Sequence, residues 1–351
     1  MTDYAAVLSS AWADHLAPRK PDALTVVSTF AGCGGSSLGY SMAGFRELLA
    51  IEWDAHAAAC FAANFPDVPL FHGDIAKFDP AQLDIEPGTL DVLDGSPPCQ
   101  GFSSFGKRRM DDPRSALFRE YVRLLDAWRP RMFVMENVPG LVAGKMKATF
   151  AEIMRALRAA GPGYRVVALL MSTDWFGVPQ RRHRLVIIGA RSDLRIAPEH
   201  PRARTRPLTV RDAFIGLPDP GLTPPMSDKI ARLASLIEPG KDGKRALLKR
   251  GYRAVAFSLI RVRWDRPSAA LTKTFYSAGS GYCGLLHPAE NRHLGSRELT
   301  RLQSFPDEYD WGASTYTQIH NRLGNSVPPL FMRAVAETIA DTLERGGLGH
   351  G

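Results

Sequence analysis

Short apolar runs alternate with segments of helical periodicity between residues 24 and 190. This alternation predicts an α/β fold in which helices cover a mostly parallel sheet. One helix is predicted over 113–128, because Asp112 can cap it and Pro113 suits its first turn. The strands are predicted over 24–30, 48–52, 92–95, 132–136, 166–170 and 184–189, and further helices over 54–64 and 330–343.

The positive charge of the chain is concentrated in one third of its length. The 351 residues carry a net charge of +8, and residues 191–296 alone contribute +10, with 19 Lys and Arg against 9 Asp and Glu. Prolines also interrupt the periodicity after residue 191. We therefore expect a large domain over 1–192 and 322–351 and a smaller, loop-rich domain over 193–321. The charge of the smaller domain favours a polyanion, nucleic acid first, over a solvated face without a partner.

The cysteines and the apolar runs exclude several classes of protein. No apolar run approaches membrane-spanning length, and the first twenty residues lack the pattern of a signal peptide. The four cysteines form no Cys-x-x-Cys pair, which argues against a zinc site or a disulfide framework. We expect a cytoplasmic protein without a bound metal. The cysteines are Cys33, Cys60, Cys99 and Cys283.

Cys99 follows two prolines at the end of a predicted strand. Pro97 and Pro98 restrict the backbone before the sulfur and remove two N–H donors. A doubly wound sheet places its chemistry at the carboxyl ends of its strands, so this thiol is a candidate nucleophile. The alternative is a buried cysteine with a packing role.

A glycine-rich run after the first predicted strand is a candidate cofactor turn. Glycines permit positive φ and close approach of a ligand, although the spacing is not that of the dinucleotide fingerprint. Acids follow the next two strands, and Trp53 offers a face for adenine. No phosphate-binding lysine lies nearby, so the pattern favours S-adenosylmethionine over ATP or NAD, with a plain tight turn as the alternative. The candidate cofactor residues here are Phe30, Ala31, Gly32, Gly34, Gly35, Ser36, Glu52, Trp53, Asp74 and Ile75.

Charged residues near two further strands are candidate catalytic groups. Glu136 ends the strand after that of Cys99, where it can act as an acid or a charge stabiliser, or simply cap a helix. Arg182 and Arg184 stand at alternate positions, so they are predicted to point to one side of an extended chain and to converge. A solvated basic turn is the alternative for the arginines.

Taken in chain order, these motifs resemble those of the DNA (cytosine-5)-methyltransferase family. The resemblance runs from about residue 24 to 340 and implies a Rossmann-like class I methyltransferase fold. One departure is Ala270-Leu271-Thr272, where family members often carry Thr-Leu-Thr. The motifs are the glycine-rich turn, Pro-Pro-Cys-Gln at 97–100, Glu-Asn-Val at 136–138, Gln-x-Arg-x-Arg at 180–184, Leu-Gln-x-Phe-Pro at 302–306 and Gly-Asn-Ser-Val-Pro-Pro at 324–329.

The resemblance implies a mechanism in which Cys99 adds to carbon 6 of cytosine. Carbon 5 then becomes nucleophilic enough to take the methyl group of S-adenosylmethionine. Glu136 would hold or protonate the ring nitrogen, while Arg182 and Arg184 would bind the base. Loss of the carbon-5 proton would expel the thiolate. Further cofactor contacts implied by the resemblance are Pro98, Asn325 and Ser326.

The same resemblance implies double-stranded DNA as the partner. A base inside a duplex hides its carbon 6, so the cytosine must be flipped out. Residues 195–293 would read the target sequence, in a monomeric modification enzyme of restriction-modification or orphan type. An RNA-directed enzyme of the same fold and a non-catalytic homologue are the alternatives. The expected substrate contacts are Ser103, Ser104, Lys107, Gln180 and Thr272.

Overall fold

The computed structural model describes residues 3–98, 113–243, 248, 251, 258–273 and 283–348. The chain packs as two compact units. The sheet unit comprises Asp14–Ser172, His183–Arg202 and Met332–Gly351, and the loop unit comprises Met1–Ala13, Thr173–Arg182 and Ala203–Phe331.

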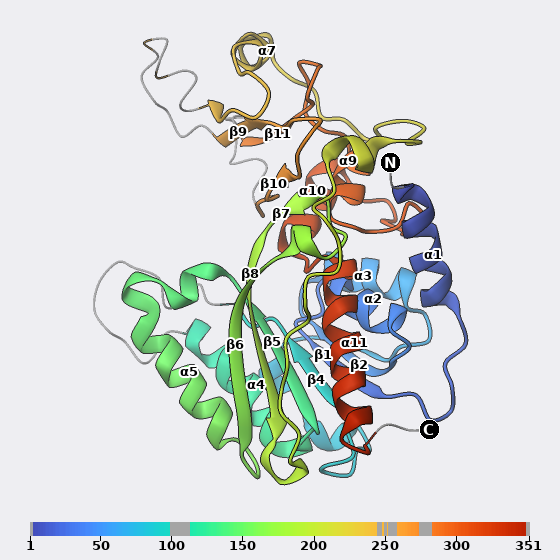
Figure 1. Cartoon of the computed structure of the whole chain (residues 1–351), viewed down its shortest axis with the longest axis vertical. Coiled ribbons are helices and arrows are strands. Elements are labelled where there is room, and N and C mark those ends of the chain that lie inside the picture. The colour runs from blue at the N-terminus through green and yellow to red at the C-terminus, as the bar shows by residue number, and fades with distance from the viewer. Residues whose placement is uncertain are drawn as a thin grey trace. The chain divides into compact units, whose positions relative to one another are not determined.

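The sheet unit is built on seven strands in the order β3-β2-β1-β4-β5-β8-β6 (Figure 1). Six strands run parallel, and β8 lies antiparallel between β5 and β6. The predicted mostly parallel sheet is therefore confirmed, with one strand of opposite direction that was not foreseen. The strands are β1 (Thr25–Thr29), β2 (Arg46–Glu52), β3 (Leu70–His72), β4 (Val92–Gly95), β5 (Met132–Asn137), β6 (Tyr164–Ser172) and β8 (His183–Arg191).

The central strands are short apolar runs because both of their faces are covered. Every residue of β4 and β5 is buried. One face packs against α4 (Pro113–Trp128) and α5 (Lys147–Ala159) through a shared apolar core. Figure 1 shows α2 (Gly35–Met42), α3 (Ala55–Asn64) and α11 (Pro329–Arg345) on the other side of the sheet. These layers bring the carboxyl ends of β1, β2, β4 and β5 to one edge.

The helix predictions are largely confirmed. Helix α4 has the predicted bounds, although its expected cap, Asp112, lies outside the described residues. Asp54 caps α3 by accepting a hydrogen bond from the backbone N–H of Ala57 at 3.0 Å. The closing helix α11 is longer than predicted, whereas α1 (Tyr4–Leu16) and α5 were not predicted. Among the described residues, no helix is long and apolar enough to cross a membrane.

The loop unit holds short elements around a small apolar core. Two parallel strand pairs, β7 with β10 and β9 with β11, accompany its helices. Residues 173–182 and 322–331 pack within this unit. The predicted large domain over 1–192 and 322–351, and the smaller domain over 193–321, stay a prediction. The elements are β7 (Gln180–Arg181), β9 (Ser258–Arg261), β10 (Ser268–Ala269), β11 (Cys283–Leu286), α6 (Val210–Phe214), α7 (Asp228–Ser235), α9 (Ser296–Leu302) and α10 (Tyr316–Asn325). Short 3-10 turns in the two units are η1 (Ile75–Lys77), η2 (Pro80–Gln82), η3 (Pro139–Val142), η4 (Gly144–Met146), η5 (Thr173–Trp175) and η6 (Ser192–Leu194).

Candidate functional site

The glycine-rich turn joins β1 to α2 through a left-handed backbone. Gly32 and Gly34 have φ values of 60° and 85°, a region that is open to glycine and strained for other residues. Phe30 is also left-handed, with φ of 56°. Strained backbone of this kind gathers at ligand sites. The turn therefore has the conformation expected of a backbone that lies close to a ligand, and Ala31, Gly35 and Ser36 lie within it or in the first turn of α2.

Glu52 ends β2 and is bonded directly to the glycine-rich turn. One carboxylate oxygen accepts the backbone N–H of Gly32 at 2.8 Å. The other accepts the N–H groups of Trp53 at 3.0 Å and Asp54 at 2.8 Å. Three backbone donors thus fix a buried carboxylate beside the turn. The next side chain, Trp53, is 76% exposed, which leaves its ring accessible for stacking.

Asp74 and Ile75 follow β3, which pairs with β2. The Asp74 side chain is exposed and accepts the backbone N–H of Ala76 at 3.0 Å, so it caps η1. Ile75 is buried in the apolar core of the sheet unit. The two predicted cofactor residues therefore lie at the expected strand end. There Asp74 caps η1 and Ile75 packs in the core.

Strand β4 leads through Pro97 and Pro98 to the position of Cys99. Cys99 itself lies outside the described residues, as do the predicted loop residues Ser103, Ser104 and Lys107. Pro97 is buried and Pro98 is exposed. The amide of Asn137 donates a hydrogen bond of 2.9 Å to the carbonyl of Pro97. The end of β5 thus holds the segment that precedes the candidate nucleophile.

Glu136, the residue before Asn137, is paired with Arg184 of β8. The Arg184 Nε lies 2.6 Å from Oε1 of Glu136, and both side chains are nearly buried. Burial lowers the pKa of Arg184, and the neighbouring Glu136 carboxylate opposes that shift. Since arginine remains protonated in proteins, the guanidinium holds the carboxyl group in one orientation.

The environment of Arg182 differs from that of Arg184. The two side chains were expected to converge, but they have different partners. The Arg182 guanidinium is 2% exposed and donates to the backbone carbonyls of Leu271 and Gly324, both at 2.6 Å. The strand is interrupted at Arg182, between β7 and β8. Alternation of side chains holds only within a continuous strand, so the rule used for the prediction does not apply across this break.

Gln180 is fully buried, and its amide is used within the loop unit. Its Oε1 accepts the N–H of Leu271 at 3.1 Å, and its Nε2 donates to Oε1 of Gln303 at 2.8 Å. Gln303 in turn donates to the carbonyls of Leu323 at 2.7 Å and Ser326 at 3.0 Å. The structure thus gives Gln180 a structural role, and its predicted contact with substrate stays a prediction.

The segment around Gly324 lies against the backbone of Thr272. A Cβ atom on Gly324 would stand 2.4 Å from the Thr272 carbonyl oxygen, so only glycine allows this approach. Thr272 and Asn325 have exposed side chains, whereas Ser326 is buried and donates to the carbonyl of Arg322 at 2.7 Å. From the sequence, the motifs containing Gln303 and Gly324 were used only for the family resemblance. The pairing of Gln-x-Arg with these motifs was missed, because it joins residues 123 positions apart.

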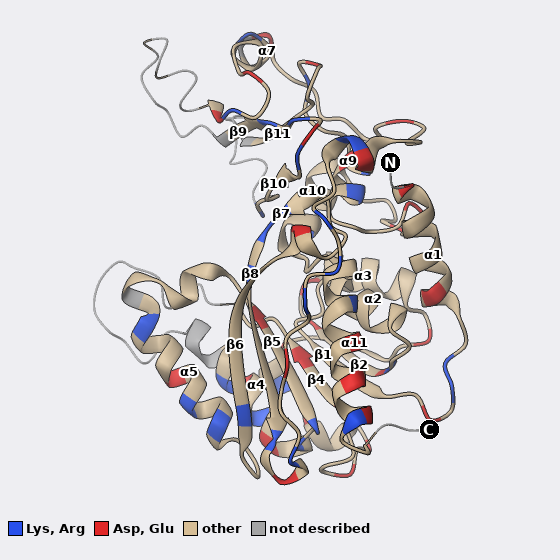
Figure 2. Ribbon diagram, in the orientation of Figure 1, with Lys and Arg blue, Asp and Glu red and all other residues tan. Residues whose placement is uncertain are grey.

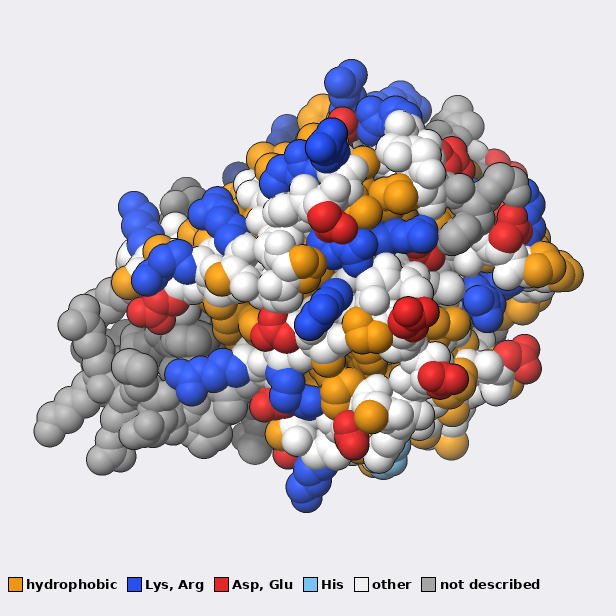
Figure 3. All heavy atoms as spheres, turned by 90° about the horizontal axis from the view of Figure 1, so that it is seen from below, with side chains coloured by type: hydrophobic (Ala, Val, Ile, Leu, Met, Phe, Trp, Pro, Cys, Tyr) orange, Lys and Arg blue, Asp and Glu red, His pale blue; other side chains and the backbone are white. Residues whose placement is uncertain are grey.

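The basic residues of the loop unit have mixed roles. Arg261 is buried and donates to four backbone carbonyls and to Asn291, so it supports the fold. Figure 2 shows that Lys and Arg residues also occur along α5 in the sheet unit. On the face drawn in Figure 3, Lys and Arg lie among Asp and Glu side chains. Exposed cations of the loop unit include Arg206, Arg211, Arg232, Lys241, Arg266 and Lys273.

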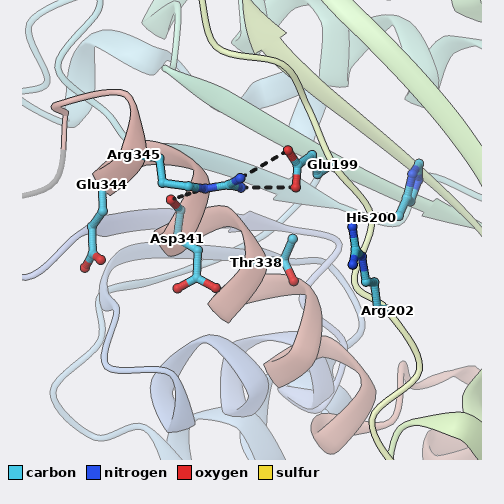
Figure 4. Close-up of a pocket in the computed structure, with 7 residues that line it drawn as sticks. All are labelled: Glu199, His200, Arg202, Thr338, Asp341, Glu344 and Arg345. Atoms are coloured by element: carbon cyan, nitrogen blue, oxygen red, sulfur yellow. Dashed lines mark hydrogen bonds and ion pairs between the residues drawn. The ribbon is translucent and has the colours of Figure 1, made fainter.

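One cavity of about 420 Å³ lies in the sheet unit near the end of α11 (Figure 4). Arg345 bridges it by pairing with both carboxylate oxygens of Glu199, at 3.1 and 3.3 Å. None of the predicted site residues lines this cavity. Within the described part of the chain, no three His, Cys, Asp or Glu side chains are grouped as metal ligands.

Known proteins resemble this chain over most of its length. The C-5 cytosine-specific DNA methylase family matches residues 24–341. The Type II methyltransferase M1.HphI of Haemophilus parahaemolyticus is 34% identical over 332 residues, which cover 90% of this chain and 86% of that protein. The Type II methyltransferase M.PspPI of Psychrobacter sp. is 32% identical over 358 residues, covering 96% and 83%.

Solved structures share the fold. A candidate DNA modification methyltransferase encoded within an E. coli prophage superimposes with a TM-score of 0.74 at 23% identity, covering 92% of this chain and 100% of that one. A variant of Spodoptera frugiperda DNMT2 gives a TM-score of 0.66 at 18% identity, covering 90% and 99%. At these identities the likeness establishes the fold alone.

Proposed function

Because this chain belongs to the C-5 cytosine-specific DNA methylase family, we propose that it methylates carbon 5 of cytosine within one short sequence of duplex DNA. The observation that carries the proposal is the Glu136–Arg184 pair. It lies at the end of β5, which pairs with β4, the strand that leads to Cys99. The relatives are named type II methyltransferases, so we place this chain among modification enzymes of that kind. We expect it in the cytoplasm, associated with the nucleoid through its DNA substrate.

The residues around the glycine-rich turn fit S-adenosylmethionine. When bound, this cofactor supplies a methyl group on a sulfonium centre. At Gly32 no atom lies within 4 Å of the place that a Cβ would take, and Glu52 is held at the strand end where a carboxylate can accept ribose hydroxyls. The exposed ring of Trp53 would stack on the adenine. Asp74, Pro98, Asn325 and Ser326 complete the proposed cofactor contacts.

The chemical steps fall to Cys99 and Glu136. The Cys99 thiolate would form a bond to carbon 6 and make carbon 5 nucleophilic, and the cofactor would supply the methyl group, whose bond to the sulfonium sulfur breaks as it bonds to carbon 5. Glu136 would hold the ring nitrogen through a hydrogen bond or protonate it, with its carboxyl group oriented by Arg184. The proton on carbon 5 would then pass to water, the electrons of that C–H bond would re-form the double bond to carbon 6, and the sulfur–carbon 6 bond would break to release the Cys99 thiolate. Arg182 would act by holding the backbone at Leu271 and Gly324.

The exposed cations of the loop unit would bind DNA. Phosphate contacts from these side chains would offset the cost of flipping the base, which is a few kcal/mol. Residues 195–293 would read the bases that flank the target, and Ser103, Ser104 and Lys107 would contact the flipped nucleotide. Thr272 has the exposure that a contact with DNA requires.

Single-base methylation mapping tests this function. Purified protein is incubated with mixed-sequence duplex DNA and S-adenosylmethionine, beside a Cys99→Ser variant and a transfer RNA substrate. We expect 5-methylcytosine within one short motif, no transfer by the variant, and cofactor affinity that the variant retains. Methylation of transfer RNA instead of DNA, or normal turnover by Cys99→Ser, contradicts the proposal.

A further inference from the structure

A buried acid that the proposed chemistry leaves unused lies beneath the glycine-rich turn. Asp94 is the third residue of β4 and is 2% exposed. Its carboxyl group accepts hydrogen bonds from the hydroxyl of Ser36 and from the hydroxyl of Tyr40, the latter at 3.4 Å. Both hydroxyl groups belong to α2, and both side chains are buried. Asp94 therefore joins the central strand to the helix that follows the turn.

The two segments that Asp94 joins are the two that must be aligned for methyl transfer. Ser36 is the second residue of α2, directly after Gly34 and Gly35. Five residues after Asp94 along the chain stands Cys99. Within the sheet, Asp94 is in register with Ser28 of β1, the strand that leads into the turn. The carboxyl group thus sets the position of the proposed cofactor turn relative to the strand of the proposed nucleophile.

We propose that Asp94 is a positioning residue for the cofactor, which holds the first turn of α2 against the strand that leads to Cys99. The inference rests on the proposed function. This role of Asp94 differs from that of Glu52, which accepts hydrogen bonds from backbone N–H groups of Gly32 in the turn and of Trp53. Without the Asp94 carboxyl group, two buried hydroxyl groups of α2 lose their acceptor, which is costly in a site closed to water.

The protonation of Asp94 agrees with this role. Burial raises its pKa, and the nearby carboxylates of Glu47 and Glu136 raise it further. Glu47 itself is bonded by the hydroxyl of Ser37 at 2.8 Å, and burial raises its pKa to about 7. The proposed role needs a hydrogen-bond acceptor of the same shape, which the amide oxygen of Asn supplies, so Asn should replace the carboxyl group well.

The test measures binding of S-adenosylhomocysteine by titration calorimetry, without any catalytic step. We expect Asp94→Ala to raise its dissociation constant about tenfold, within the range for a lost buried acceptor. Asp94→Asn should stay within about threefold of the unchanged protein, and the dissociation constant for DNA should be unchanged in both. The matched control is Asp91→Ala, which removes another buried acid, whose partners are Thr25, the first residue of β1, and Arg131, which directly precedes β5. This control should lower the melting temperature and leave cofactor binding intact.

Equal binding of S-adenosylhomocysteine by Asp94→Ala and the unchanged protein overturns the inference, as does an equal loss of affinity for DNA and cofactor. Should Asp94→Ala fail to fold, Tyr40→Phe decides, because it removes one of the two donors and keeps the ring. Unchanged cofactor affinity in Tyr40→Phe then overturns the inference. If the unchanged protein does not bind S-adenosylhomocysteine, the proposed cofactor is wrong and the inference falls with it.

Discussion

The Nε of Arg184 lies 2.6 Å from Oε1 of Glu136, and the two side chains are 12% and 9% exposed. A guanidinium bonded through Nε fixes the plane of the carboxylate as well as its charge. The pair joins β5 to β8, the one strand of opposite direction in the sheet. The antiparallel strand thus brings its first residues to the edge of the sheet where β4 and β5 end.

We predict that Arg184→Lys lowers kcat by about 10²-fold or more, because an ammonium cannot reproduce the planar, directed contact with Glu136. The matched control is Arg181→Lys, since Arg181 also pairs with an acid, Asp174, but is 58% exposed. Steady-state methylation of a short duplex measures both variants. Equal activity in the two would show that the orientation of Glu136 does not matter for the reaction.

We predict that Trp53→Ala weakens binding of S-adenosylhomocysteine by the loss of one stacking contact, worth about 1–3 kcal/mol. Trp175→Ala is the control, because Trp175 is also exposed, at 46%, but belongs to the loop unit. Calorimetric titration of each variant gives the comparison. A similar loss in both, or in neither, would remove Trp53 from the proposed adenine site.

We predict that Gly324→Ala lowers the free energy of unfolding by about 1–3 kcal/mol, because the added methyl group overlaps the Thr272 carbonyl and forces the backbone to shift. Gly140→Ala should change it by less than about 0.5 kcal/mol, since a Cβ there meets nothing within 4 Å. Urea denaturation measures both variants. A stable Gly324→Ala protein would mean that the segment at Thr272 is free to move away.

We predict a pH-dependent contribution to stability from Glu47. Its pKa is raised by burial from 4.5 to about 7, so the folded state binds its proton more tightly than the unfolded state does. The contribution is therefore complete below about pH 4.5 and is lost as the pH rises through about 7. Its size is on the order of 1–3 kcal/mol.

Urea denaturation of the unchanged protein and Glu47→Gln at pH 5 and pH 8 tests this contribution. Glu47→Gln should lose less stability between the two pH values than the unchanged protein. Because the Glu47 carboxylate also raises the pKa of Asp94, the difference between the two proteins reports Glu47 together with its effect on Asp94. Identical slopes would indicate that Glu47 titrates as an exposed carboxyl group.

Much of the sheet unit could be predicted because its signals are local. The apolar run over 92–95 is a strand with the predicted bounds, and Asp54 caps its helix as its place in the sequence suggests. Helix α4 likewise has the predicted bounds. Glu136 was identified because an acid after an apolar run must stand at the end of the strand.

The partners of the arginines and glutamines could not be predicted from the same signals. Alternation placed Arg182 and Arg184 together, but a break in the strand gives Arg184 an acid and Arg182 two carbonyls. Gln180 was expected to contact substrate, yet its amide is buried against Gln303. The residues next to either glutamine in the sequence do not indicate that the two side chains form a hydrogen bond.

The sequence by itself determined the alternation of strands and helices, the position of the glycine-rich turn and the family of the chain, because spacing along the chain carries those features. Only the tertiary structure decided the antiparallel course of β8, the pairing of Glu136 with Arg184 and the buried bonds of Asp94. These depend on which distant segments pack together. A buried polar group takes its partner from whatever that packing brings within reach.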